Sequence, residues 1–529
     1  MTASSTYDAI VIGGGPNGLV AAATLGKAGR RVLLIERESE LGGQSRAVEV
    51  ATGFRAPISA DAGWLPPSVA RELGLGRQPT VTPEISVAVA DDDGGFLVLP
   101  REPSRAAEVL RARSPSDATR WPGFVETVGK LAGFLEALYQ VPAPQIDSRS
   151  IGEILPLLGL GRKLRSLGRE DMIELLRVMP MPIQDLLDDA FESPVLKAAV
   201  AAAGVQGIRQ GPRSGGTSFV LLHHLVGAPA GSMRARSWWH EGPEAFTVAA
   251  EGAARQRGVV IRSGTDVSHV IVRDDAVAGV ALYGGEEITA PVVVSTADPS
   301  RTLLRLVDPV WLDPEFLHAL GTIKFRGSTA IVCYAIDRLP ELPGVPSAEQ
   351  ALAGVVSLTS GMNALERAYD AAKYGTMSEE PHIEITVPSL RWPSLAPAGK
   401  HVVTATARYA PYALRGGGAW DATRACTLAD TVTAAIARVI PRFADSVLHH
   451  TVLTPADIET QFGLTEGAAT QGELTLDQIL FMRPVPGWAR HAMPIDGLYL
   501  GGAGTHPGPG ILGGSGLLAA RRVLADRKR

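Results

Sequence analysis

The hydrophobic pattern at the start of the chain predicts a strand, a helix and a second strand. Residues 7–12 (YDAIVI) and 31–35 (RVLLI) are short apolar runs typical of buried strands. Between them, apolar residues recur at helical spacing from Leu19 to Ala28 and stop at Gly29. This order predicts an α/β fold with a parallel sheet covered by helices.

The same kinds of pattern return later in the chain. Residues 497–520 read as a short apolar strand, a glycine loop and an Ala/Leu-rich helix, and residues 101–210 are mainly helical. Within the latter, residues 162–177 and 183–205 carry apolar residues at the three- and four-residue spacing of helices. A further group comprises a helix over 244–257, strands over 259–263, 266–273, 278–283 and 292–295, and a hairpin turn at Asp274 and Asp275.

Glycine is concentrated in two of these loops. The chain has 58 glycines among 529 residues; four of them fall within residues 13–18, and eight within residues 501–516. The first cluster, GGGPNG, matches the dinucleotide-binding pattern GxGxxG and sits between the predicted strand and helix. We therefore expect it to bind a dinucleotide pyrophosphate at the N-terminus of the helix.

Each residue of this loop has an expected role. Gly13 permits the tight turn, Gly15 lets the pyrophosphate approach the backbone, and Gly18 allows close packing of helix and strand. Pro16 and Asn17 begin the helix that faces the phosphates. Glu36 ends the second strand at the spacing expected for an acid that binds the adenosine ribose, with Arg37 beside it.

The residues after Glu36 favour FAD over NAD. The sequence ERESELGG places Gly42 and Gly43 where a second backbone segment can pass close to the same cofactor. FAD lies extended and is contacted by several segments, whereas NAD has no need of such a pair. The last glycine loop lacks a following strand with a terminal acid, so we expect it to close on the flavin side of the same FAD through Gly504, Gly510, Ile511 and Leu512.

Composition and charge exclude several classes of protein. Hydrophobic residues make up 45% and charged residues 20%, which are globular values, and the net charge of -5 does not suit a nucleic-acid binder. Cys333 and Cys426 are too far apart for a CxxC pair or a disulfide framework, and no histidine spacing indicates a metal site. No Lys or Arg precedes Lys27, so we expect no secretory signal and a cytoplasmic location.

Taken together, these motifs resemble the FAD-dependent phytoene-desaturase-like flavoproteins, a group that includes bacterial carotenoid desaturases. The resemblance rests on YDAIVIGGGPNGL, ERESELGG and LYLGGAGTHPGPGILG. Interior segments such as TSFVLLHH, VSTADP and GELTLDQILFMRP are similar to the subgroup named pyridine nucleotide-disulfide oxidoreductase domain-containing protein 2. The resemblance implies that Val267 presents its backbone to the adenine.

The chain departs from that subgroup's pattern at three places. It has Gln471 where the pattern has a histidine before the GEL segment, Trp392 where it has an aspartate, and the sequence EGPE over 241–244 where it has a glycine pair. These departures concern the substrate rather than the FAD frame.

We expect two domains. A Rossmann-type FAD-binding domain is assembled from residues 1–80, 245–299 and 485–529. A mixed α+β substrate domain, including a helical insertion, comprises residues 81–244 and 300–484. A chain of this length usually divides in this way.

The chemistry predicted is oxidation of an organic substrate. There is one dinucleotide fingerprint and no cysteine pair, so electrons would enter by hydride transfer from an apolar, carotenoid-like substrate to flavin N5 and leave to oxygen or a quinone. Two alternatives stay open: a structural FAD in a binding or regulatory protein, and a redox-neutral isomerase. Peripheral membrane contact and a homo-oligomer are also left open.

Candidate catalytic residues are few. His506 in the last glycine loop is the first candidate for a polar group beside the flavin, and Arg483 could place positive charge there. His240 and Glu241 belong to an aromatic and polar cluster that could line the substrate face. His223, in an apolar run, fits a core histidine better than a catalytic one.

Overall fold

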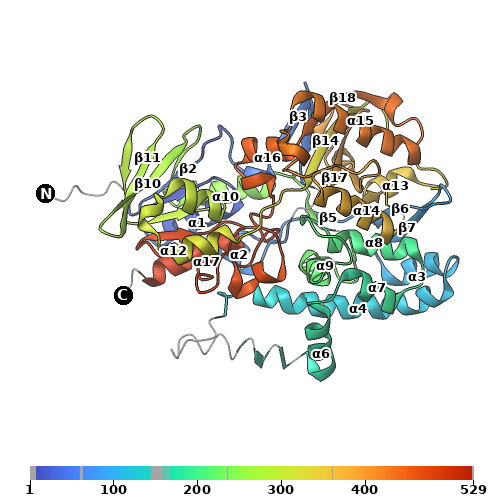
Figure 1. Ribbon diagram of the computed structural model, residues 1–529, viewed down its shortest axis with the longest axis horizontal. Helices are drawn as coiled ribbons and strands as arrows, with labels where there is room; N and C mark the ends of the chain where they lie inside the picture. Colours follow the sequence, from blue (N-terminus) through green and yellow to red (C-terminus); the bar gives the residue numbers. More distant parts are fainter. Residues whose placement is uncertain are drawn as a thin grey trace.

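The protein has two main sheets with a helical region beside one of them (Figure 1). This computed structural model describes residues 7–59, 63–144, 159, 161–162, 164–165, 167–234, 236–359 and 361–526. Figure 1 places α1, α10 and α17 in one half, and β14, β17 and α15 in the other.

The first sheet is parallel and draws its strands from three distant parts of the chain. Its order is β19, β13, β1, β2, β9. The strands are β1 (Ala9–Ile12), β2 (Val32–Ile35), β9 (Val260–Arg262), β13 (Val293–Ser295) and β19 (Leu498–Leu500). This is the Rossmann-type sheet, assembled from discontinuous segments, that the sequence predicts.

Alternation along β1 shows how the two faces of this sheet are covered. Ala9 and Val11 face a core built with α1 (Pro16–Lys27), α2 (Pro67–Leu73), α10 (Ala245–Gln256) and α17 (Gly514–Asp526). Ile10 and Ile12 face a core built with α12 (Pro314–Gly321) and an antiparallel sheet of β10 (Val267–Arg273), β11 (Ala276–Leu282) and β12 (Glu287–Thr289).

The predicted turn between β10 and β11 is confirmed, since Asp274 and Asp275 have φ of 51° and 59°, as type I′ hairpin turns require.

The second sheet has seven strands in the order β18, β14, β17, β16, β15, β6, β7. They are β6 (Ile85–Ala90), β7 (Phe96–Pro100), β14 (Thr329–Ile336), β15 (Val355–Ser357), β16 (Ile383–Thr386), β17 (His401–Arg408) and β18 (Val447–Leu453). Helices α13 (Ala348–Leu352) and α15 (Ala422–Val439) contribute to its core. All seven strands come from residues 81–244 and 300–484, while the domain limits themselves stay a prediction.

The region between β7 and β8 (Trp238–Trp239) is mainly helical. It contains α3 (Pro103–Arg111), α4 (Pro115–Leu138), α6 (Gly168–Val178), α7 (Ile183–Ala190), α8 (Pro194–Gly204) and α9 (Thr217–Leu225). The helical spacing predicted over 183–205 is confirmed as two helices, which are divided at Phe191–Ser193, where Ser193 caps a new helix that starts with Pro194. In the stretch 162–177, residues 162, 164 and 165 are helical and α6 begins at Gly168, while residues 163 and 166 lie outside the described residues.

A buried cluster of charges joins the helical region to the second sheet. Glu384 on β16 accepts hydrogen bonds from Arg408 on β17, at 2.8 Å, and from Arg234. Arg234 also donates to the carbonyl of Ala199 on α8 at 3.1 Å. Burial alone would raise the pKa of Glu384, but the two arginines outweigh it and hold that pKa well below its usual range.

Replacing Glu384 with Gln should therefore destabilise the fold. Two buried guanidinium groups would lose their counter-charge, which costs about 3–5 kcal/mol at neutral pH. Because the folded pKa of Glu384 is depressed, its stabilisation is present above the unfolded pKa of about 4.3 and is lost as the pH falls further. Urea unfolding at several pH values measures this.

The matched control is Glu380→Gln, whose side chain is 65% exposed and forms ion pairs at 3.7 and 3.8 Å. Its effect should stay below about 1 kcal/mol at every pH. Equal effects of the two substitutions at neutral pH would contradict the role given to Glu384.

Candidate functional site

Several loops meet at the carboxyl edge of the parallel sheet. Gly13 follows β1, Glu36 follows β2 and Thr296 follows β13, so parallel strand ends bring them together. These loops line one cavity, called the cofactor cavity below. Its wall includes Gly13, Gly15, Pro16, Asn17, Glu36, Arg37, Gly43, Gln44, Ser45, Asp266, Val267, Thr296, Arg301, Trp238, Gln471, Gly510, Ile511 and Leu512.

The fingerprint loop has the geometry that a dinucleotide needs. Gly13 has a φ of +100°, and a Cβ on Gly18 would lie 1.9 Å from the Gly13 carbonyl oxygen. A Cβ on Gly15, by contrast, would meet nothing nearer than the Gly42 carbonyl at 4.0 Å, so Gly15 borders open space. Helix α1 begins there without a side-chain cap, so its first N–H groups are available to an anion. The residues present fit a pyrophosphate.

Hydrogen bonds from backbone N–H groups hold the side chain of Glu36 in place. Its Oε2 accepts from the Gly14 N–H at 2.6 Å and its Oε1 from the Glu38 N–H at 2.9 Å. The side chain is 9% exposed and lies on the cavity wall near Asp266 and Val267. The fold thus places Glu36 and Val267 together, as the sequence predicts, and their contacts with ribose and adenine stay predictions.

The glycine pair after Glu36 passes beside the fingerprint. The N–H of Gly42 donates to the Gly14 carbonyl at 2.9 Å. A Cβ on Gly43 would lie 3.6 Å from the Cα of Gly15, and both residues of the pair have positive φ. A second backbone segment therefore borders the space expected for the pyrophosphate.

The last glycine loop contributes the other end of the cavity wall. Trp64 pairs with it through backbone hydrogen bonds to Gly510, at 2.7 Å, and from Leu512, at 2.8 Å. The side chain of His223 also bonds to this loop, because its Nε2–H donates to the Pro509 carbonyl at 2.9 Å. Its Nδ1 then accepts from the Tyr139 hydroxyl at 2.8 Å, and burial lowers the pKa of His223 to about 3. This buried, fully bonded histidine has a structural role.

Gln471 bridges the segment after β13 and the last glycine loop. In the sequence it stands out only as a departure from the family pattern. Its Nε2 donates to the Thr296 carbonyl at 3.2 Å, and its Oε1 accepts from the Gly504 N–H at 2.9 Å. Gly504 is not among the described wall residues and its amide is bonded to Gln471, so its contact with FAD stays a prediction. A Cβ at Gly504 would lie 2.3 Å from Pro299, so packing requires the glycine.

Two predicted catalytic residues are turned away from the cavity. Arg483 is 1% exposed, and its guanidinium donates to backbone carbonyls that include those of Ala503 and Gly472. Burial lowers its pKa to about 10. His506 is fully buried, donates from Nε2 to the Val141 carbonyl at 3.0 Å, and has its pKa lowered by burial to about 4. Neither lines the cofactor cavity, so both organise the loop instead.

His240 and Glu241 are also placed outside the site. Both side chains are exposed, and neither belongs to the wall of the cofactor cavity. Their neighbour Trp238 is 6% exposed and does line it. Of this cluster, an aromatic residue lines the cavity and the two polar residues do not, so a substrate contact by the cluster stays a prediction.

Positive charge on the wall comes from Arg37 and Arg301. Arg37 donates to the Thr460 carbonyl at 2.7 Å, beside α16 (Pro455–Phe462). Arg301 ends α11 (Pro299–Arg301), whose first turn is capped by Asp298. Arg301 could not be identified from the sequence, because the short helix after β13 carries no motif.

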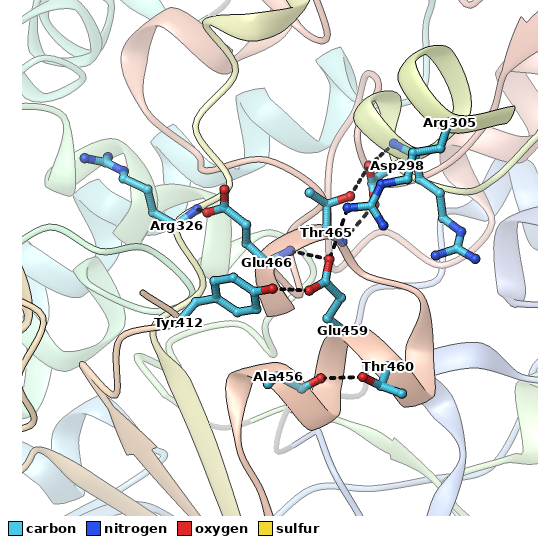
Figure 2. A network of polar contacts seen from close by, with 10 residues as sticks. Asp298, Arg305, Arg326, Tyr412, Ala456, Glu459, Thr460, Thr465 and Glu466 are labelled. Atoms are coloured by element: carbon cyan, nitrogen blue, oxygen red, sulfur yellow. Dashed lines mark hydrogen bonds and ion pairs between the residues drawn. The ribbon is translucent and has the colours of Figure 1, made fainter. Parts of the chain in front are cut away.

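The Asp298 cap also ties two distant segments together, as Figure 2 shows. Asp298 accepts from the N–H and the hydroxyl of Thr465, both at 3.0 Å. Next to it, Glu459 accepts from Tyr412 and, at 3.4 Å, from Arg305. Burial raises the pKa of Asp298, although its hydrogen bonds oppose this. This network fixes the helix that carries Arg301.

The described residues contain no group of three or more His, Cys, Asp or Glu side chains placed to hold a metal ion. In the same part of the chain, every helix is too short or too polar to cross a membrane.

Known proteins resemble this chain over its whole length. Residues 11–71 match a family model described as an NAD(P)-binding Rossmann-like domain. The rat protein named pyridine nucleotide-disulfide oxidoreductase domain-containing protein 2 is 34% identical, covering 99% of this chain and 94% of its own. A neurosporene-forming phytoene desaturase of Cereibacter sphaeroides is 23% identical, covering 100% and 96%. These relatives confirm the resemblance noted in the sequence.

A solved structure confirms the fold. Putrescine oxidase bound to putrescine has a TM-score of 0.59 and 13% identity, covering 99% of both chains. At that identity the likeness concerns architecture alone.

Gly15 and Gly18 should respond differently to substitution. Gly15→Val places methyl groups in the space expected for the pyrophosphate, at a backbone φ of -74° that valine can adopt, so flavin content should fall while the apoprotein stays folded. Gly18→Ala collides with a carbonyl and should also destabilise the apoprotein by about 1–3 kcal/mol. Flavin-to-protein absorbance ratios and thermal unfolding measure both effects. Gly252→Ala on α10, where a Cβ meets nothing, is the control; full flavin content in Gly15→Val would place the pyrophosphate elsewhere.

Gln471→Leu should weaken FAD binding without unfolding the protein. It leaves the Gly504 N–H and the Thr296 carbonyl without their partner, and we expect roughly ten-fold weaker FAD binding. Flavin titration of the apoprotein measures this. Gln256→Leu, an exposed position at the end of α10, should leave the affinity unchanged. Equal affinities of Gln471→Leu and the native protein would show that the bridge does not shape the cavity.

Proposed function

The chain belongs to the family of pyridine nucleotide-disulfide oxidoreductase domain-containing protein 2 and is an FAD-dependent oxidoreductase; from this premise we propose that it dehydrogenates an apolar organic substrate. The observation that carries the proposal is the cofactor cavity. One continuous wall includes Glu36 and Val267 as well as Ile511 and Leu512. A site shared by both glycine loops suits one extended dinucleotide with its flavin at the second loop.

The cavity residues would bind and orient this cofactor. The N-terminus of α1 and the amides near Gly15 face the pyrophosphate, and Arg37 and Arg301 add positive charge to the wall. Helix α17 begins at Gly514, two residues after Leu512, so its N-terminus lies at the flavin end and favours negative charge there. When bound, FAD supplies the capacity to accept a hydride from a substrate carbon.

The flavin end of the wall is apolar. It includes Ile511 and Leu512, and Trp238 and Pro243 line the neighbouring cavity together with Leu512. Among all the described wall residues the acids are Glu36 and Asp266, and neither His nor Lys occurs. Such a surface positions a carbon–hydrogen bond and keeps water away from it, while the second hydrogen of the substrate leaves as a proton to solvent. The electrons would pass on to oxygen or a quinone.

The relatives support the proposal without specifying the substrate. A phytoene desaturase acts on a polyene by name, and the structurally similar putrescine oxidase on an amine. The apolar flavin end favours a substrate whose reacting carbon lies in an apolar body, and it disfavours a diamine. A cytoplasmic location stays a prediction.

Anaerobic mixing tests the proposed reaction. The flavin-loaded protein is combined with a panel of polyenes, terpenes, amines and aromatic acids, and we expect an apolar member to bleach the oxidised flavin, with one desaturated product formed per flavin. Product formation without net bleaching would indicate an isomerase instead. Oxidised flavin persisting across the whole panel would favour a structural FAD in a binding protein.

A further inference from the structure

A second cavity opens beside the flavin end of the cofactor cavity. It has a volume of about 640 Å³, which falls in the range of small-molecule sites. Gly63, Trp238, Pro243 and Leu512 line both cavities, so the two adjoin there. Its remaining wall comes from α2, the segment after α2, and the start of α10. It is called the aromatic cavity below.

We propose that the aromatic cavity is the substrate site, and that it takes an amphipathic anion with an aromatic or apolar body and a terminal oxyanion. The inference rests on the proposed function, since it places the substrate next to the flavin. It narrows the substrate to a class that neither an uncharged polyene nor a diamine represents.

The inner part of this cavity is aromatic and rigid. Trp238 and Phe246 are each 6% exposed, and Phe246 packs edge-on against Trp239 at 5.8 Å between ring centroids. The Trp392 indole N–H donates to the Trp239 carbonyl at 3.0 Å, and Trp392 packs edge-on against Trp238 at 5.3 Å. These contacts fix the rings before a ligand arrives, which reduces the entropic cost of binding a flat or apolar group.

The outer part of the cavity is positively charged. Arg71 on α2 and Arg77 both line it and are exposed. No Asp or Glu occurs among the described lining residues. In the described part of the chain, neither guanidinium forms a hydrogen bond or an ion pair, so both are available to a ligand oxyanion.

Together these features impose a direction on the ligand. Its apolar body would pass Trp238 toward Leu512, where the flavin end begins, and its oxyanion would stay at Arg71 and Arg77 near solvent. The carbon–hydrogen bond that is oxidised therefore lies in the apolar body, and the hydride goes to the flavin while a proton is released to water. Arginine recognises carboxylates and phosphates alike, so the oxyanion is the shared chemistry.

Ligand titration of the flavin-loaded protein tests this inference. The probes are 4-phenylbutyrate, 4-phenylbutyl phosphate and the uncharged 4-phenylbutanol, each followed by changes in the flavin spectrum and in tryptophan fluorescence. We expect at least one anion to bind about five-fold more tightly than the alcohol, as one exposed ion pair allows. The tighter of the two anions identifies the carboxylate or the phosphate.

Charge variants then locate the oxyanion. In Arg71→Ala/Arg77→Ala the anion should bind no more tightly than the alcohol, while the affinity for the alcohol is unchanged. Arg71→Glu/Arg77→Glu should instead favour 4-phenylbutylamine. Arg442→Ala, whose side chain is 80% exposed, is the matched control and should keep the native preference. A native protein that does not discriminate anion from alcohol, or a double variant that still does, would overturn the inference.

A blocking variant tests the aromatic cavity itself. Ala70 lines it from α2, and Ala70→Phe should weaken binding of both the anion and the alcohol while flavin content is retained. Undiminished binding in a folded Ala70→Phe protein would place the probes elsewhere. Flavin content, measured on every preparation, separates the two proposals. A protein that binds no flavin contradicts the proposed function, whereas one that binds flavin but shows no charge preference contradicts this inference alone.

Discussion

Backbone contact between helix α1 and its neighbours is the constraint on which the cofactor cavity depends. A Cβ on Gly18 would lie 1.9 Å from the Gly13 carbonyl, and a Cβ on Gly516 would lie 1.9 Å from the Asn17 carbonyl. Helix α1 therefore packs without intervening side chains against the loop after β1 and against helix α17. Both glycine loops are held at one helix start, and the open space beside Gly15 lies between them.

A second layer of polar contacts holds these loops in place. Gln471 bridges Thr296 and Gly504, His223 holds Pro509, and Asp298 joins Thr465 to the helix that carries Arg301. These side chains come from different parts of the chain and bond mostly to backbone groups. A wall preorganised in this way can present amides and positive charge to a cofactor with little rearrangement.

The sequence predicts those parts of the site that depend on residues close together in the chain. Strand, glycine loop, helix and terminal acid follow one another, so the Rossmann sheet, the fingerprint and the neighbouring glycine pair could be predicted from their spacing. The roles of Arg483 and His506 could not be predicted, because their hydrogen-bond partners are carbonyls brought close only by tertiary folding, such as those of Ala503 and Val141. The contacts of Gln471 and Arg301 could not be predicted for the same reason, since neither residue belongs to a motif that indicates its partners.

The central claim is that one FAD spans both glycine loops. Hydrogen–deuterium exchange of the FAD-loaded protein against the flavin-stripped protein measures this directly. Slower exchange on FAD binding is predicted for the amides of residues 13–18 and, in the same experiment, for those of residues 509–516. Protection confined to the first loop, with unchanged exchange in the second, would contradict the claim.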